Sequence, residues 1–413
     1  MTHDPLAWPG ADGPAFAARP AHRRWLMDRA DALFRFFGHR AIDPAGGFHA
    51  LGDDGAPLPD QGPRPLHDTT RMVHCHAIGH LLGRPGSADM LDHGMRTLAR
   101  RHRDAAHGGW HWSFDADGPA DAAKRAYGHA FVLLAGASAA MAGHPDGKAL
   151  LAEAAEIHEV LFWDDAAGMG VEDYAADWTE PEPYRGQNSN MHLTEALMAA
   201  QEATGDSVFL DRARRIAGRL IDGHARDAGW VVPEHFHPDW TERPDYDGDP
   251  MFRPGGTTPG HALEWARLLT QLHGLGGEDW MPAAAAALFD AACAGGWDGA
   301  RGGFVYTLGT DGTVSRPLRL WWPLAEGAAA SSVLAAAQPA PRFEAWYRRI
   351  WGVIDAEVID PATGAWKPEL DPAAPPIFRG RPDLYHALGA CLTPLGAPDR
   401  TLGQAARDGS LMA

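Results

Sequence analysis

The chain has 413 residues, a net charge of −18 and 45% hydrophobic residues. It has no basic stripe of the kind that binds nucleic acid, no run of about 20 apolar residues that spans a membrane, and no start typical of a signal peptide. We therefore expect a cytoplasmic protein with neither nucleic acid nor membrane as a partner. Its three cysteines, Cys75, Cys293 and Cys391, are far apart and lack CxxC spacing, which indicates neither a disulfide framework nor a zinc knuckle.

Twelve predicted helices alternate along the chain in two chemically distinct sets. The first helix of each pair is amphipathic with a charged face, at roughly 21–38, 86–103, 147–162, 206–224, 280–294 and 341–356. The second is poorer in charge and richer in Ala, Gly, Leu, His and Trp, at roughly 68–82, 124–141, 187–204, 260–273, 322–337 and 382–394. Because a helix that is apolar nearly all round is normally buried, the second set should form an inner ring and the first an outer ring.

A glycine-containing turn separates the two helices of every pair, and in five of the six turns a large aromatic residue follows the glycines. The turns are marked by Phe48, Trp110, Met169, Trp230, Phe304 and Trp366, at intervals of 59 to 74 residues. This repeat predicts an all-α fold, an (α/α)6 barrel of six inner and six outer helices with the Gly-aromatic turns at one end. We expect one barrel domain over 20–395, an irregular N-terminal segment over 1–19 and an irregular C-terminal tail over 396–413.

Polar side chains gather at the starts of the predicted inner helices. They are Arg71 with His74, Tyr127 with His129, Asn188 with His192, His261 with Glu264, Trp322 with Glu326, and Tyr385 with His386. Since the six helices run in the same direction, these side chains should meet at one mouth of the barrel. A single buried histidine is more often structural, but His192, His261 and His386 at three such starts favour a proton-transfer site.

Six strings of the sequence resemble one protein family. The most specific are RGQNSNMH (185–192) and FRPGGTTPGHALEWARLL (252–269), and others are TRMVHCHAIGHLL (70–82), KRAYGHAFVLLAGA (124–137), LRLWWPLAEGAAA (318–330) and GRPDLYHALGACLTPL (380–395). The chain resembles the N-acylglucosamine 2-epimerase superfamily of sugar isomerases and epimerases, and within it the aldose–ketose isomerases of mannose and sulfoquinovose. The resemblance implies an (α/α)6 barrel, a monosaccharide substrate and no cofactor or metal.

The resemblance also implies roles for individual residues. His261 and His386 would be the acid/base pair, and the substrate contacts would come from Arg71, Tyr127, Asn188, His192, Arg253, Glu264, Trp322 and Glu326. The implied reaction moves a proton between C2 and C1 of an open-chain sugar through a cis-enediol, and a neutral imidazole suits the task of base. We expect His386 to transfer this proton and His261 to open the ring, although the residue types allow the reverse. Glu264 and Glu326 would orient the imidazoles.

Several alternatives remain open from the sequence. Conversion of D-mannose to D-fructose is the expected reaction, with D-lyxose to D-xylulose as a related one. A sulfoquinovose isomerase would need cations such as Arg71, Arg253 or Arg381 near C6, and a 2-epimerase of N-acylglucosamine or mannose would need proton transfer on both faces of C2. An (α/α)6 glycoside hydrolase would use Glu264 and Glu326 as its two carboxyl groups. A helical scaffold protein is the non-enzymatic alternative, and a homo-oligomer is compatible with the sequence.

Two further features leave their roles undecided. The segment from Val231 to Pro259 departs most from the repeat, and it is either a lid or a surface excursion. His76 and His80 have the i, i+4 spacing of a zinc-ligand pair, with His74 beside them, but their spacing offers no third ligand. We therefore expect no metal there.

Overall fold

The computed structural model describes residues 15–412 except 180, 372–376 and 382–383, and this part of the chain is predominantly helical. The inner helices are α2 (Leu66–Leu81), α4 (Ala126–Met141), α6 (Gln187–Thr204), α8 (Pro259–Gly274), α10 (Trp321–Ala337) and α12 (Tyr385–Leu392). The outer helices are α1 (Pro20–Phe36), α3 (Ser87–Thr97), α5 (Gly147–Ile157), α7 (Ser207–Ala217), α9 (Met281–Gly296) and α11 (Pro341–Val353). The predicted (α/α)6 barrel is confirmed, while the predicted start of the last inner helix, at 382, lies outside the described residues.

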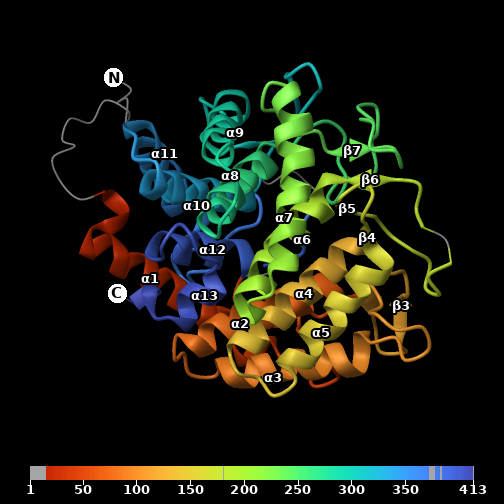
Figure 1. Cartoon of the computed structure of the whole chain (residues 1–413). Helices are drawn as coiled ribbons and strands as arrows, with labels where there is room; N and C mark the ends of the chain where they lie inside the picture. The colour runs from red at the N-terminus through yellow and green to blue at the C-terminus, as the bar shows by residue number, and fades with distance from the viewer. Residues whose placement is uncertain (1–14, 180, 372–376, 382–383, 413) are drawn as a thin grey trace.

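The inner helices form a closed ring. Each contacts the next, from α2 to α4 and onward to α12, and α12 contacts α2. Five inner helices pack against the outer helix that follows them in the chain, whereas α12 packs against α1, so the first and last helices of the barrel meet. In Figure 1 the outer helices α1, α3, α5, α9 and α11 lie around the inner ones.

The two sets of helices differ in burial as their composition predicts. Helix α4 buries all but two of its 16 residues, whereas α3 and α7 bury mainly one face. Fully buried side chains such as Phe131 in α4 and Trp265 in α8 fill the space between helices. Burying a side chain of this size contributes about 1.5–3 kcal/mol of transfer free energy, and this contribution explains why the inner positions are apolar.

Four outer helices end in a π-helical turn, which makes them as long as the sequence predicts. The turns are Leu98–His102 after α3, His158–Phe162 after α5, Gly218–Ala225 after α7 and Ile354–Val358 after α11. The Gly-aromatic turns follow, and bridges pair Arg103 with Trp110 and Trp297 with Phe304 across them. Gly109 and Gly303 have φ of +67° and +87°, a region that only glycine enters freely.

Short antiparallel strands lie between the outer and inner helices, at the mouth of the barrel. They are β1 (Arg64–Pro65), β2 (Ser113–Phe114), β3 (Pro119–Asp121), β4 (Trp163–Asp164), β5 (Met169–Gly170), β6 (Arg185–Gly186), β7 (His235–Phe236), β8 (Val305–Leu308) and β9 (Val314–Arg319). The sheets are β1-β2-β3, β4-β5, β6-β7 and β8-β9. In β6-β7 Gly186 pairs with His235, which ties the start of α6 to the segment Val231 to Pro259.

The C-terminal tail differs from the prediction, because it contains a helix, α13 (Leu402–Arg407). This helix contacts α2, α4 and α6. Thr401 bonds Glu202 near the end of α6, and Gln271 near the end of α8 donates to the Arg400 carbonyl at 2.8 Å. The tail therefore closes the barrel at the end opposite the mouth. A helix of six residues is too short for hydrophobic periodicity to reveal.

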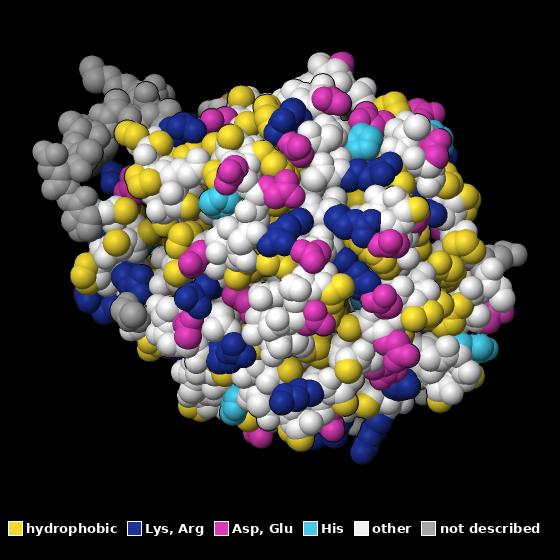
Figure 2. Space-filling view, viewed as in Figure 1, with side chains coloured by type: hydrophobic (Ala, Val, Ile, Leu, Met, Phe, Trp, Pro, Cys, Tyr) yellow, Lys and Arg dark blue, Asp and Glu magenta, His cyan; other side chains and the backbone are white. Residues whose placement is uncertain are grey.

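The remaining short 3-10 helices are Phe16–Ala18, His39–Ala41, Thr393–Leu395 and Ser410–Met412. No helix among the described residues is long and apolar enough to span a membrane. On the face shown in Figure 2, acidic and basic side chains are interspersed.

Candidate active site

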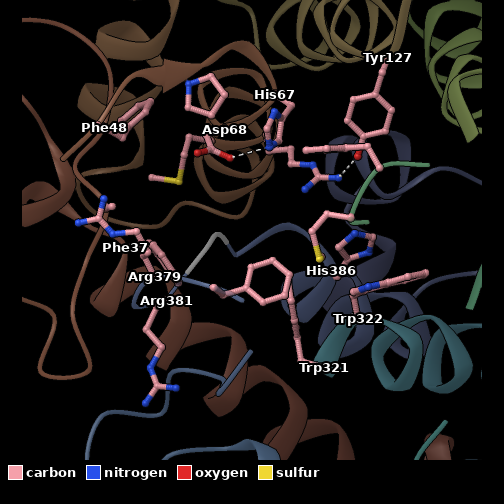
Figure 3. Close-up of a pocket in the computed structure, with 18 of the residues that line it drawn as sticks. Phe37, Phe48, His67, Asp68, Tyr127, Trp321, Trp322, Arg379, Arg381 and His386 are labelled. Atoms are coloured by element: carbon pink, nitrogen blue, oxygen red, sulfur yellow. Dashed lines mark hydrogen bonds and ion pairs between the residues drawn. The ribbon is translucent and has the colours of Figure 1, made fainter. Parts of the chain in front are cut away.

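A cavity of about 440 Å³ opens at the mouth of the barrel. Every inner helix contributes a predicted residue from its first two turns to the lining: Arg71 from α2, Tyr127 from α4, Asn188 and His192 from α6, His261 and Glu264 from α8, Trp322 from α10 and His386 from α12. The common direction of the inner helices thus gathers residues that lie more than 300 positions apart. Figure 3 shows Tyr127, His386 and Trp322 at one side of this cavity, with Phe37 and Phe48 at the other.

The segment Val231 to Pro259, whose role the sequence left undecided, supplies part of the cavity wall. Met251 and Phe252 line the cavity, and the Phe252 ring packs against Trp112 and Tyr127 at 5.9 and 5.6 Å between centroids. Tyr306 donates to the Met251 carbonyl at 2.8 Å. The segment is therefore built into the site.

His261 is held by a buried carboxylate, Glu234. Its Nδ1 lies 2.9 Å from each Glu234 oxygen, and the same carboxylate accepts from the backbone N–H of Thr258 at 3.1 Å. Gln187 Nε2 donates to Glu234 at 2.7 Å, and Trp265 Nε1 donates to Gln187 Oε1 at 2.8 Å. The indole fixes the orientation of the amide, and the amide helps to fix the carboxylate.

His386 is held in the same manner by Glu326. Its Nδ1 lies 2.8 Å from Glu326 Oε1, and Glu326 Oε2 accepts from Arg267 Nε at 3.0 Å. Both carboxylates are at most 4% exposed. His261 and His386 therefore belong to two Glu–His pairs on one cavity.

Trp322 lies between the two imidazoles. Its ring centroid is 5.2 Å from that of His261 and 5.8 Å from that of His386, with interplanar angles of 34° and 38°. The indole fixes the spacing of the two rings and gives the cavity a flat apolar surface, to which the C–H face of a sugar can pack.

The carboxylates determine which ring nitrogen of each histidine is available. An ionised carboxylate only accepts, so Nδ1 carries the proton and Nε2 is left to accept or deliver one. Burial alone would raise the pKa of Glu234, but the charge and hydrogen bond of His261 outweigh it and the pKa falls below its ordinary value. Burial also raises the pKa of Glu326, but the charge of Arg267 and the hydrogen bond of His386 outweigh it, so that this pKa too is lowered. Both groups stay ionised at neutral pH.

Arg71, Tyr127 and Asn188 line the same cavity as the two histidines. Arg71 Nη2 donates to the Tyr127 hydroxyl at 2.8 Å, and its guanidinium lies 4.5 Å from the Phe131 ring centroid. Asn188 Nδ2 donates to the Phe252 carbonyl at 3.3 Å, while its buried Oδ1 has no hydrogen-bond partner among the described residues. These groups can bind sugar hydroxyls and stabilise a developing oxyanion.

A charged cluster lies below the cavity, around Arg267. This guanidinium bonds Glu326, Glu195 at 3.1 Å and Glu264 at 3.3 Å. His192, Glu195 and Glu264 also have the atoms and spacing of a metal-binding group. Because the Arg267 guanidinium already bonds both of these carboxylates, its positive charge opposes a metal cation at this position.

The model of the N-acylglucosamine 2-epimerase (GlcNAc 2-epimerase) family matches residues 46–390. The chain belongs to this family. A relative from Thermobifida fusca named D-mannose isomerase is 45% identical, with 92% of this chain and 96% of the relative covered. Another of that name, from Pseudomonas cannabina pv. alisalensis, is 40% identical, with 91% and 93% covered.

Solved structures agree with this assignment. A crystal structure of D-mannose isomerase matches with a TM-score of 0.86 at 33% identity, covering 93% of this chain and 99% of that one. A cellobiose 2-epimerase from Spirochaeta thermophila DSM 6192 matches with a TM-score of 0.78 at 22% identity, covering 95% and 98%. At this lower identity the likeness shows a shared fold.

Two residues that the family resemblance implied as substrate contacts do not line the cavity. Glu326 lies below His386, and Arg253 is held by Glu182 at 2.7 Å and Asp173 at 3.1 Å, with its guanidinium 4.2 Å from the Tyr184 ring centroid. The carboxylates therefore already neutralise the Arg253 guanidinium. Phe252, the preceding residue, lines the cavity, whereas Arg253 does not.

Glu264 does not orient His261, contrary to our expectation, because it bonds Arg267 and lies 3.7 Å from His192 Nδ1. Histidines at other inner-helix positions are structural. His74 Nδ1 lies 2.7 Å from the Ser138 hydroxyl, and His129 bonds the Arg125 carbonyl and the Trp110 N–H. His76 bonds the Phe37 carbonyl.

Glu234, Gln187 and Arg267 belong to the site but were not among the residues predicted from the sequence. Gln187 and Arg267 lie within the two most specific strings, RGQNSNMH and PGHALEWARLL, yet neither was assigned a role. Glu234 follows a Gly-aromatic turn and bonds a histidine 27 positions away. The sequence signal for Glu234 was a single acidic residue between the apolar residues 231–233 and His235, which could have indicated a buried carboxylate.

Proposed function

We propose that this protein is an aldose–ketose isomerase that interconverts D-mannose and D-fructose. The observation that carries the proposal is the pair His261 and His386, which line one cavity on either side of Trp322, each with Nδ1 bound to a buried carboxylate. The relatives named D-mannose isomerase, at 45% and 40% identity over nearly the whole chain, support this reaction.

Ring opening is the first step, and we assign it to His261. Its neutral Nε2 accepts the proton of the O1 hydroxyl, the C1–O5 bond breaks, and the imidazolium passes a proton to O5, which returns His261 to its neutral form. The product is the open-chain aldose with a C1 carbonyl. Glu234 stabilises the imidazolium that forms, because the carboxylate bonds the Nδ1–H.

Proton transfer between the carbons follows, and we assign it to His386. Nε2 removes the C2 proton, the electron pair forms the C1=C2 bond, and the C1=O1 π electrons move to O1 to give the cis-enediolate, the deprotonated form of the cis-enediol. The proton of the O2 hydroxyl then passes to O1, the C2 carbonyl forms, and the imidazolium returns a proton to C1. A positioned general base is typically worth about 10²- to 10⁴-fold in rate.

Arg71 is the cation we expect to stabilise the enediolate oxygen. Its guanidinium keeps a fixed direction because it lies against the Phe131 and Tyr385 rings, 4.5 and 4.8 Å from their centroids. A donor that is held in place before the reaction stabilises developing charge without reorganisation. Tyr127 and Asn188 would bind the remaining hydroxyls.

The charge distribution supports a neutral sugar over sulfoquinovose. Arg253 is already paired with Glu182 and Asp173, behind the wall. Arg381 lines the cavity but lies 3.3 Å from Asp360 and 3.4 Å from Asp53. Two of the three arginines considered from the sequence for a sulfonate thus already have carboxylate partners.

The carboxyl groups argue against a glycoside hydrolase. That chemistry needs two carboxyl groups facing the sugar, one as acid and one as base or nucleophile. Of the pair considered from the sequence, Glu264 lines the cavity but Glu326 is bound to His386 and Arg267 beneath it. A 2-epimerase remains chemically close, since two imidazoles also suit proton transfer on two faces.

The test is incubation of EDTA-treated protein with D-mannose in D2O, followed by NMR. We expect D-fructose, with deuterium at C1 to the extent that the transferred proton exchanges with solvent. D-Glucose as the sole product would replace the proposal with C2 epimerisation. If mannose is unchanged, the proposal is wrong, and sulfoquinovose, N-acylglucosamine and an aryl mannoside are the next substrates to test.

A further inference from the structure

Three carboxyl groups share one buried cation below the cavity. Arg267 bonds Glu326 through Nε, Glu195 through Nη1 and Glu264 through Nη2. Arg267 is 7% exposed, and Glu326 and Glu264 are 4% and 1% exposed. If all three were ionised, the cluster would carry a net charge of −2, and burying such unpaired charge is strongly unfavourable.

The three carboxyl groups differ in their other donors. Glu195 accepts from the Tyr385 hydroxyl, and Glu326 accepts from His386 Nδ1. Glu264 receives the longest of the three bonds from Arg267 to a carboxyl group, at 3.3 Å, and its buried Oε2 has no hydrogen-bond partner among the described residues. Glu264 is therefore the carboxyl group least suited to carry a negative charge.

The groups that face Glu264 from the surrounding helices reinforce this difference. They are Arg267 on its own helix, His192 and Glu195 on α6, Glu326 on α10, Tyr385 and His386 on α12, and Arg71 on α2. Burial, followed by the charge of Glu326, raises the pKa of Glu264 well above its ordinary value, and Arg267 offsets this only in part. At Glu195 burial is outweighed by Arg267 and His192, so its pKa is lowered.

His192, the neighbour of Glu264 on α6, has a ring nitrogen without a hydrogen bond. His192 Nδ1 is 3.7 Å from Glu264 Oε1 and 3.8 Å from Glu195 Oε2, and it has no hydrogen-bond partner among the residues the structure describes. Burial lowers the pKa of His192 to about 4, so its ring is neutral. A proton on Glu264 therefore faces a neutral imidazole rather than a competing cation.

We propose that Glu264 is a neutral carboxylic acid in the free protein and that it acts on the bound sugar as a hydrogen-bond donor, while Glu195 and Glu326 are the two carboxylates that neutralise Arg267. The role on the sugar rests on the proposed function. A neutral Glu264 in the cavity wall donates to a sugar oxygen and adds no negative charge that would repel the enediolate.

Protonation is tested first by stability, which needs no substrate. Glu264→Gln keeps the shape and removes only the titration, whereas Glu195→Gln leaves Arg267 with one carboxylate fewer and is the matched control. We expect the Tm of E264Q to equal or exceed that of the wild type near neutral pH, and the Tm of E195Q to fall by at least about 3 °C. Equal losses in both variants would overturn the proposal.

The pH dependence of Tm gives a second readout. A carboxyl group that keeps its proton only in the folded state costs stability as pH rises above the unfolded value of about 4.3. E264Q cannot lose that stability, so its Tm relative to wild type should increase from about pH 5 to about pH 9. A difference that stays constant or decreases would contradict a neutral Glu264.

Infrared spectroscopy and kinetics complete the test. At neutral pH the wild type should show a protonated-carboxyl C=O band that is missing from E264Q, and an unchanged band overturns the proposal. With mannose, E264Q keeps a donor and should retain kcat/KM within about 10-fold, whereas Glu264→Leu should lose about 100-fold. Equal losses in the two variants would refute the donor role. If the wild type itself does not turn over mannose, the proposed function fails, while the infrared and Tm results still decide the protonation.

Discussion

The two Glu–His pairs present the same chemistry to the cavity but are built differently. Glu234 reaches His261 from a turn, and its other partners are an amide and a backbone N–H. Glu326 reaches His386 from an inner helix, and its other partner is the charged Arg267. One carboxylate is thus kept ionised by neutral donors and the imidazole, the other by a buried cation. The His386 pair therefore depends on the charge of Arg267, which is shared with Glu195 and Glu264.

Removing either imidazole should have the largest effect and test whether both pairs act in one reaction. We expect His386→Ala to lower kcat for mannose by about 10³-fold or more and His261→Ala by a smaller factor, since a single general base contributes about 10²- to 10⁴-fold. Steady-state kinetics, with circular dichroism as a folding check, measure this. The exposed His273, also on α8, provides the control. Full activity in His386→Ala would exclude the assigned role.

Neutralising each carboxylate compares the two pairs directly. Glu326→Gln should lower kcat by about 10²-fold and Glu234→Gln by about 10-fold, because a carboxylate that orients a functional histidine typically contributes about 10- to 100-fold and the first change also disturbs Arg267. KM should change little in both. The measurement is kcat and KM across pH, and a larger loss in Glu234→Gln would reverse the comparison.

The acid stability of the protein should depend on Glu326. Its pKa is lowered in the fold, so its contribution to stability is complete above the unfolded value of about 4.3 and is lost as pH falls. The free energy of unfolding of wild type should therefore exceed that of Glu326→Gln at neutral pH, and the gap should narrow toward about pH 3. Urea denaturation at several pH values measures it, and a gap independent of pH would contradict this linkage.

The smallest effect on chemistry is expected at Arg253, which contributes to neither pair. Arg253→Met should leave kcat within about 3-fold, since the guanidinium does not line the cavity, but should lower Tm by a few degrees because three carboxyl groups lose their cation. Burial raises the pKa of its neighbour Glu172 to about 7, so the loss in Tm should be larger above that pH than below it. A 100-fold loss in kcat/KM would contradict this assignment and indicate that Arg253 contacts the substrate.

The sequence predicted what local pattern and repetition determine. The helices follow from periodicity and charge, the turns from glycine, and the gathering of Arg71, Asn188, His261 and His386 from the common direction of the inner helices. All of these are properties of a single repeat. They persist in the structure because each repeat buries the same face against its neighbours.

The pairing of side chains across the ring could not be predicted in this way. Helix spacing suggested that Glu264 orients His261. Arg267 lies on the same helix face, however, and it is Arg267 that bonds the Glu264 carboxyl group. Glu234 lies beside β7, which pairs with β6 before α6, and it meets His261 because it also accepts from the Thr258 N–H at the start of α8. Such contacts depend on how separate repeats are placed in space, which no one repeat specifies.

In the part of the chain that the structure describes, helix α13 covers the end of the barrel opposite the mouth. Thr401 and Leu402 join the floor of a small cavity below the cluster, beside Glu195 and Arg267. A sugar that reaches the imidazoles must leave by the way it entered, so product and incoming substrate exclude one another and each should inhibit the opposite direction competitively. A tag fused to the C-terminus would project from the closed end and leave the mouth of the barrel open. Deleting the residues after Asp399 would instead let water reach the Arg267 cluster from the opposite end.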